Sequence, residues 1–434
     1  MNYSVIVFII TFLIIGFILI YITKYKGINF DSKLLTLFGI LYIGYLLFAL
    51  VVNAAHEEIG VFFLYTDQNG FFAEANLLSK SNSLREIFIE CFINKSHQED
   101  EGAYFLFGSI AYIGNTYFNG NSILLQTINV SFVGVLCNIF LYKTLLYYFD
   151  RAKAFRYTLY FAFLSPIFYY SPWLLRDIHI TLFYMVGIYL VHKKFKLRIF
   201  LSFALLFILT YQFRVSHGLF FIVFPFLYLI NKGRNHKNYK LILVLLSCLV
   251  IFSVYIYSSD LIYIYNSIYL SYDNLSEFTS ESLNNSGLGS QLYKLPTGIK
   301  ELALIVNSQI SQFPPWFNVS DAKTIIQMLI GIAMLVNSVF WSYIFVFTIF
   351  SMTQKKVRRK ITNETLIWLS VIFVFFLINS VNINVRRIFC VYPIIYLVFL
   401  EIRRPMSIKE KYRINHIFFI LYSLLITFYL ILKS

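Results

Sequence analysis

The sequence predicts an all-α protein, a polytopic bundle of transmembrane helices. Of its 434 residues, 59% are hydrophobic and only 13% are charged, and the mean hydropathy is +0.70. A soluble domain of this length cannot bury so much apolar surface, so lipid must surround part of the chain. The apolar runs are continuous and reach the length of a spanning helix, about 20 residues. Strands of a transmembrane barrel would instead alternate apolar and polar residues.

The apolar runs predict about twelve spans within a single integral membrane domain, residues 1–434. Some runs are shorter than a full span, so a range of about ten to thirteen spans remains open. The first run, Tyr3–Ile22, lacks a small-residue cleavage site and is too long for a signal peptide, so we expect a retained anchor. The expected spans are residues 4–23, 34–55, 121–142, 157–173, 178–192, 199–213, 218–231, 241–258, 324–350, 363–382, 388–402 and 415–432.

The distribution of charge predicts the orientation of these spans. Six short connections hold 25 of the 36 Lys and Arg residues, whereas two long loops hold 15 of the 21 acidic residues. The positive-inside rule places the basic connections in the cytoplasm. External loop 1 (56–120) and external loop 2 (259–323) then lie outside, together with both termini. We expect a multi-pass protein of a bacterial inner membrane whose active face is external.

Both external loops contain apolar and aromatic stretches, among them Val61–Tyr65, Ala103–Phe107 and Leu261–Tyr265. Such stretches are typical of short helices that lie in the membrane interface rather than of disordered linkers. We therefore expect interfacial helices across the outer face of the bundle.

Composition and motifs exclude several classes of function. The formal net charge of +15 is explained by the cytoplasmic connections, so we expect no nucleic-acid partner. The four cysteines are widely spaced and form no metal-ligand pattern, so we expect no metal, no cofactor and no disulfide. The sequence has no HExxH, GxSxG or P-loop motif, which argues against zinc, serine-hydrolase and ATPase chemistry.

Four arginines lie at the external ends of apolar runs, against the positive-inside rule: Arg176, Arg214, Arg386 and Arg387. A guanidinium binds phosphate through two parallel hydrogen bonds and stays charged at any working pH. A group of four at the lipid–water boundary suits a lipid-linked diphosphate. Alternatively, each arginine reaches a lipid head group on its own.

Acidic and histidine side chains near these arginines supply candidate acid–base groups. Asp67, at the start of external loop 1, can act as general base for a sugar hydroxyl. Asp177 follows Arg176 directly. The two residues either belong to a functional site or only mark the end of a helix. His179 and His217 are candidate proton shuttles or phosphate donors, although a lone histidine at a helix end is often a simple polar contact. Glu57, Glu58 and Glu74 are alternatives to Asp67, and the run 99–101 is expected to be a solvated surface.

At these residues the sequence resembles multispanning glycosyltransferases of the GT-C type. One similarity is the acid–aromatic–Ala–Leu pattern of a first external loop, here Asp67, Phe71 or Phe72, Ala75 and Leu78. A Ser-Pro followed by Arg-Asp at a helix corner, residues 164–177, is another. The third is an Arg–Pro entry to a late span, residues 384–393. In size, span number and loop layout the chain is similar to the Wzy-type polymerases of O-antigen and capsule repeat units.

The resemblance implies a glycosyl transfer from an undecaprenyl-diphosphate-linked glycan to a second lipid-linked glycan. Arg176, Arg214, Arg386 and Arg387 would hold the diphosphate, assisted by His179, His217 and Glu74. Asp67 or a neighbouring glutamate would take the proton. A chain-length regulator is the implied partner besides the lipid bilayer. The sugar, the linkage and an inverting or retaining outcome stay open.

Two other functions are considered. A related GT-C enzyme would add a single sugar from a polyprenyl-phosphate donor. A flippase for lipid-linked oligosaccharides would need charges near the middle of its spans. Glu364 and Glu401 instead lie near the expected cytoplasmic ends of spans, and the other polar features gather on one face. This one-sided distribution favours an enzyme over a flippase.

Overall fold

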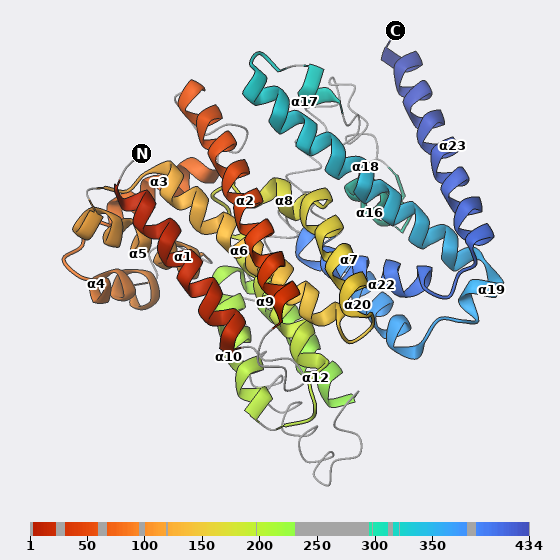
Figure 1. The fold of residues 1–434 in the computed structure, drawn as a ribbon, viewed down its shortest axis with the longest axis horizontal. Coiled ribbons are helices and arrows are strands. Elements are labelled where there is room, and N and C mark those ends of the chain that lie inside the picture. Colours follow the sequence, from red (N-terminus) through yellow and green to blue (C-terminus); the bar gives the residue numbers. More distant parts are fainter. Residues whose placement is uncertain are drawn as a thin grey trace.

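The computed structural model describes residues 3–22, 31–59, 67–94, 100–118, 120–196, 198–230, 295–296, 298–310, 316–320, 322–379 and 388–433. These residues are predominantly helical and include no strand, which confirms the all-α fold class. Figure 1 shows the helices as a bundle, with shorter helices packed at its ends. The helices are α1 (Tyr3–Ile22), α2 (Ser32–Ile59), α3 (Asp67–Leu78), α4 (Leu84–Phe88), the π-helix η1 (Ile89–Ile93), α5 (Glu101–Phe118), α6 (Ile123–Leu145), α7 (Arg151–Leu164), α8 (Pro166–Tyr170), α9 (Asp177–Val191), α10 (Arg198–Phe213), α11 (Val215–Phe221), α12 (Val223–Tyr228), α16 (Ile299–Ile310), α17 (Phe317–Ser320), α18 (Ile325–Thr353), α19 (Lys355–Arg358), α20 (Asn363–Asn379), the 3-10 helix η3 (Phe389–Val391), α22 (Tyr392–Arg403) and α23 (Ile408–Lys433).

Three helices are long and apolar enough to cross a membrane: residues Ser32–Glu58 of α2, all of α6 and all of α18. Shorter apolar helices accompany them within α1, α9, α10, α11–α12 and α20. Each expected span that falls on described residues coincides with a helix or a pair of helices, and the span expected at 241–258 lies outside them. The helices therefore support membrane association, while the number of crossings stays a prediction.

Two of the expected continuous spans are broken. The span expected at 157–173 divides at Ser165, which is extended (φ −91°, ψ 159°) between α7 and α8. Pro166 lacks an N–H, and its ring disfavours the helical conformation in the preceding residue. The span expected at 218–231 divides at Ile222, between α11 and α12. Pro225 follows within α12, where it cannot donate to the carbonyl four residues earlier.

Helix α6 lies at the centre of the bundle, packed between α2 and α9. The side chain of Asn138 is fully buried there and donates to Tyr45 Oη of α2 (2.7 Å) and to the Gly134 carbonyl (2.8 Å). Tyr45 Oη in turn donates to the Ala162 carbonyl of α7 (2.9 Å). Polar groups buried in an apolar bundle must be satisfied by such bonds, and this chain of bonds ties three helices together.

The bundle has two distinct ends. At one end the start of α18 meets the end of α2, where Thr324 Oγ1 donates to Glu58 Oε2 (2.9 Å). At the other, Tyr148 after α6 donates to Glu364 Oε1 at the start of α20 (2.8 Å). Figure 1 draws the first end uppermost, with α3, α17 and both chain termini on that side. The part of external loop 1 that the structure describes forms α3, α4, η1 and α5, with α3 packed against α5.

The outer faces of several helices are apolar. On α10, Leu201, Leu205 and Ile208 are all more than half exposed, and on α23 Phe419 and Leu424 are as well. In water such contiguous apolar surface would drive association. The same apolar surface is stable against lipid tails without packing on another protein.

Candidate functional site

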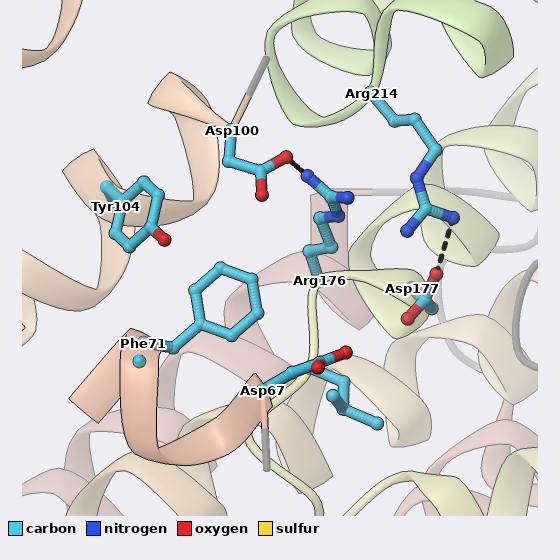
Figure 2. A pocket seen from close by; sticks show the side chains of 9 residues that line it. Asp67, Phe71, Asp100, Tyr104, Arg176, Asp177 and Arg214 are labelled. Atoms are coloured by element: carbon cyan, nitrogen blue, oxygen red, sulfur yellow. Dashed lines mark hydrogen bonds and ion pairs between the residues drawn. The ribbon is translucent and has the colours of Figure 1, made fainter. Parts of the chain in front are cut away.

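Four charged residues that the sequence singles out line one cavity of about 290 Å³: Asp67, Arg176, Asp177 and Arg214. They come from three separate parts of the chain, namely the start of α3, the corner before α9 and the corner before α11. Figure 2 shows their polar ends around the same space, together with Phe71, Asp100 and Tyr104. We call this cavity the Asp–Arg pocket; Gly70 and Leu175 complete its lining.

Arg176 is positioned by a buried corner between α8 and α9. The three residues before it, Trp173, Leu174 and Leu175, are at most 1% exposed. The fully buried amide of Gln68 on α3 accepts a hydrogen bond from Leu174 N (2.9 Å). This bond joins the corner to α3, the helix that begins with Asp67. Arg176 and Asp67 are therefore held in place by a shared contact.

Arg214 is positioned by a tight corner between α10 and α11. Its backbone N–H donates to the Thr210 carbonyl (2.9 Å) and its carbonyl accepts from Gly218 N (3.0 Å), so it joins the two helices. The corner needs a glycine, because a Cβ on Gly218 would lie 2.5 Å from Tyr211 Cα. Real Cβ atoms do not approach backbone this closely. The backbone of α11 therefore packs directly on α10.

Each arginine of the pocket pairs with a carboxylate. Arg214 Nη1 donates to Asp177 Oδ1 at 2.8 Å, and these side chains are 11% and 7% exposed. Arg176 pairs with Asp100, and these side chains are 17% and 19% exposed. A guanidinium has five N–H donors, so one carboxylate does not saturate it. Formally, three carboxylates and two guanidinium groups give the pocket a charge of −1.

Asp100 corrects one expectation and adds a residue that the sequence did not identify. The run 99–101 was expected to be a solvated surface, yet Asp100 lines the pocket and pairs with Arg176. Its carbonyl accepts from Ala103 N and Tyr104 N (3.0 and 3.1 Å), which starts α5. Gly102 lets this helix start approach the end of α10, since a Cβ there would lie 2.8 Å from the Phe213 ring. An acid directly before an apolar run is a signal that could have identified Asp100.

The remaining wall of the pocket combines an exposed acid with aromatic side chains. Asp67 is exposed at the first turn of α3. Phe71, one turn later, lies against Tyr104 of α5 with ring centroids 5.2 Å apart. Burial, with smaller contributions from Glu74 and Asp67, raises the pKa of the Tyr104 hydroxyl. Tyr104 therefore stays a hydrogen-bond donor at neutral pH, beside a carboxylate that water can reach.

Three predicted substrate-binding residues do not line the pocket. Glu74 lies two turns beyond Asp67 and lines a separate cavity with Glu86 and Glu90. His179 is 4% exposed, with its ring between Phe107 and Phe213 (centroids 5.7 and 5.3 Å away). His217 is 2% exposed beside Phe375 (5.6 Å). Both histidines pack in the protein core, where aromatic rings cover them.

Other candidates lie elsewhere or outside the described residues. Arg386 and Arg387 belong to the undescribed segment 380–387. The helix η3 that follows packs against α9, and its Phe389 stacks on Tyr170 with centroids 5.2 Å apart. The alternative acids Glu57 and Glu58 end α2, where they accept from Asn53 and Thr324 and do not line the pocket.

The Asp–Arg pocket combines groups suited to moving a proton and stabilising an anion. A water-accessible carboxylate, Asp67, can accept a proton, and Arg176 and Arg214 can stabilise negative charge on a leaving group. In the described part of the chain, no group of three or more His, Cys, Asp or Glu side chains is placed to hold a metal ion. Comparisons of the chain with protein-family models, with curated proteins and with solved structures find no match.

Proposed function

We propose that this protein is a membrane glycosyltransferase that polymerises O-antigen or capsule repeat units in a bacterial inner membrane. Its substrates would be undecaprenyl-diphosphate-linked oligosaccharides at the external face. The supporting observation is the Asp–Arg pocket, in which two arginines and an exposed acid meet at one end of an apolar helical bundle. A lipid-linked substrate needs this combination of a polar site and adjacent membrane.

In this proposal the chain crosses the membrane about twelve times, with loops 56–120 and 259–323 outside. The pocket then opens at the external face, and α3 and α5 lie over the bundle in the outer interface. The apolar outer faces of α10 and α23 support a lipid surround. A partner that regulates chain length is implied only by the family resemblance.

The proposed reaction joins two lipid-linked glycans. A hydroxyl oxygen of the acceptor forms a bond to the anomeric carbon of the donor, and the bond from that carbon to the diphosphate oxygen breaks. The hydroxyl proton passes to Asp67, and the electron pair of the broken bond leaves with the lipid diphosphate. Arg176 and Arg214 stabilise the charge that develops on this leaving group. The reaction consumes no nucleotide sugar and needs no cofactor.

Substrate binding in this scheme requires an exchange of anions. With a formal charge of −1, the pocket does not attract a diphosphate strongly while both carboxylates are in place. The Arg176–Asp100 pair is the more exposed of the two and the easier one to open. We therefore expect phosphate to replace Asp100 at Arg176, while Asp177 keeps Arg214 in position.

The test uses purified protein and a lipid-diphosphate-linked repeat unit, with products resolved by size. We expect a ladder of longer chains that is lost in both Arg176→Ala and Arg176→Lys, because lysine cannot provide the bidentate geometry. Arg85→Ala is the matched control, since Arg85 is exposed on α4 of the same loop and does not line the pocket.

Other outcomes of this experiment would contradict the proposal. A ladder that survives in Arg176→Ala at the wild-type rate would remove the arginine from the site. Transfer of one sugar from a polyprenyl-phosphate donor, without a ladder, would instead identify a single-sugar GT-C transferase. Movement of the intact lipid across proteoliposomes, with no new glycosidic bond, would identify a flippase.

A further inference from the structure

A second charged cavity, of about 440 Å³, lies at the opposite end of the bundle from the Asp–Arg pocket. It is formed by the turn after α6, the start of α7, the end of α22 and the start of α23. Helix α22 begins next to η3, which packs on α9, and ends at Arg403 after 12 residues, or about 18 Å of helix. Four basic side chains and one acid line the cavity, a formal charge of +3: Lys153, Arg403, Arg404, Lys411 and Asp150. We call it the basic pocket.

Two of the four basic side chains have carboxylate partners. Lys153 Nζ lies 2.9 Å from Asp150 Oδ2, where Asp150 also caps α7. Arg404 Nη1 lies 3.3 Å from Glu401 Oε1 and donates to the Tyr148 carbonyl (3.3 Å). In both pairs the basic side chain is more than half exposed to solvent. The carboxylates therefore neutralise Lys153 and Arg404, but each pair contributes little to the stability of the fold.

Arg403 and Lys411 have no carboxylate partner in the part of the chain that the structure describes. Both side chains are half-buried, and Arg403 Nε is buried without a hydrogen-bond partner among the described residues. The nearby Glu410 carboxylate instead accepts from Ser407 N and Oγ (2.7 and 3.0 Å). Burial and the charge of Arg403 lower the pKa of Lys411, and a smaller opposing contribution from Glu410 does not cancel this shift. Two half-buried cations held together in this way are unfavourable unless an anion neutralises them.

The other walls of the basic pocket are aromatic and apolar, with Phe149, Tyr157 and Leu400 beside the cations. Tyr148 is held rigidly, because its hydroxyl meets both Glu364 and His192. A ligand that fits must therefore carry a negative group and an apolar part. The positive-inside rule explains basic residues on this side, but it does not require them to converge from three segments on one cavity.

We propose that the basic pocket binds the phosphate of an anionic phospholipid head group, with Arg403 and Lys411 as its ligands. A guanidinium and an ammonium group together can satisfy a phosphodiester, and basic pockets between helices at a membrane surface bind such head groups. Soluble phosphate shares this chemistry, so the test must separate the two sources. The proposal does not depend on the proposed glycosyl transfer.

The experiment measures retained lipid on the purified full-length protein by native mass spectrometry, after mixing with dioleoyl-phosphatidylglycerol or dioleoyl-phosphatidylcholine. Wild type is compared with the double variant Arg403→Gln/Lys411→Gln and with Lys409→Gln/Arg413→Gln. The second pair removes two exposed charges of α23 that do not line the pocket. We expect the first double variant to lose phosphatidylglycerol by on the order of tenfold and the control to keep it.

A third arm adds inorganic phosphate. If phosphate displaces no lipid at millimolar concentration and phosphatidylglycerol is preferred over phosphatidylcholine, the lipid is the ligand. If phosphate binds with the same dependence on Arg403 and Lys411 and the two lipids bind equally, the site is still a phosphate site, but its ligand is soluble. Equal lipid retention in the two double variants would overturn the proposal.

Discussion

The two charged pockets hold arginines in opposite ways. In the Asp–Arg pocket, Arg176 and Arg214 each pair with an aspartate, and each lies at a corner fixed by buried packing. In the basic pocket, Arg403 and Lys411 have no such partner among the described residues. Pairing fixes the direction of a guanidinium but cancels its attraction for anions. The first arrangement suits a site where atoms must be aligned, and the second suits simple retention of a charged ligand.

The Arg214–Asp177 pair gives the largest expected effect. Arg214→Met removes the guanidinium that lies 2.8 Å from the Asp177 carboxylate, a side chain only 7% exposed. We expect the free energy of unfolding in detergent to fall by about 3–5 kcal/mol. Adding Asp177→Leu should recover most of the loss, because an apolar pair of similar volume removes the buried charge altogether.

The matched control is Arg404→Ala, in the lining of the basic pocket. Arg404 is 56% exposed in its pair with Glu401, so the expected loss is below about 1 kcal/mol. Unfolding of the three variants is followed by circular dichroism in one detergent. Similar losses in Arg214→Met and Arg404→Ala would show that the first pair is as solvated as the second, and the contrast between the pockets would fail.

The corner between α10 and α11, where Arg214 lies, gives the second-largest expected effect. In Gly218→Ala the new Cβ meets Tyr211 backbone at 2.5 Å, so we expect a loss of about 1–3 kcal/mol. Gly39→Ala on α2 is the control, because a Cβ there meets no atom within 4 Å. A helical glycine with open space around it should gain about 0.5–1 kcal/mol on replacement by alanine. Thermal unfolding that shifts in the same direction for both variants would contradict the close approach of α11 to α10.

Asp100 allows the exchange of anions to be measured directly. Asp100→Asn removes the carboxylate that competes for Arg176 and brings the formal charge of the pocket to zero. We expect affinity for farnesyl diphosphate, measured by calorimetry, to rise by about fivefold, the equivalent of an exposed ion pair of about 1 kcal/mol.

The control for Asp100 is its neighbour Glu101. Glu101→Gln makes the same change in net charge one residue away, but Glu101 does not line the pocket. We therefore expect Glu101→Gln to raise the affinity for farnesyl diphosphate much less than Asp100→Asn does. Weaker diphosphate binding in Asp100→Asn would mean that Asp100 orients Arg176 for the ligand rather than competing with it.

Hydropathy predicted the helices better than their breaks. The cost of exposing an apolar run to water acts over the whole run, so α2, α6 and α18 fall within a few residues of their expected spans. The break at Ser165 depends on one local clash with the ring of Pro166. A window of about 20 residues averages such a clash away.

Charge at the ends of apolar runs predicted Arg176, Asp177 and Arg214, because an unpaired charge at that depth is costly. Asp67 was predicted separately, as a candidate general base at the start of external loop 1. Asp100 was missed because it belongs to a run of three consecutive acids, residues 99–101, which is typical of a solvated surface. His179 was expected in the site because it lies close to Arg176 in the sequence. Residues i and i+2 of a helix, here Asp177 and His179, nevertheless point to opposite faces. His179 accordingly turns toward Phe107 and Phe213 while Asp177 faces Arg214.

The smallest expected effect concerns the basic pocket without ligand. Because the pKa of Lys411 is lowered in the folded protein, the unfolded chain binds its proton more tightly, and stability rises as pH increases from the lowered pKa toward the normal value near 10.5.

Lys411→Gln removes the repulsion with Arg403, so lipid-free protein at pH 7 should melt higher by on the order of 1 °C. Saturating phosphatidylglycerol should reverse the order, since the wild type then gains the bound anion. Lys409→Gln, an exposed neighbour, should change neither melting temperature. If Lys411→Gln melts lower than wild type without lipid, Lys411 already has an anionic partner within the protein, and the two pockets hold their cations in the same way.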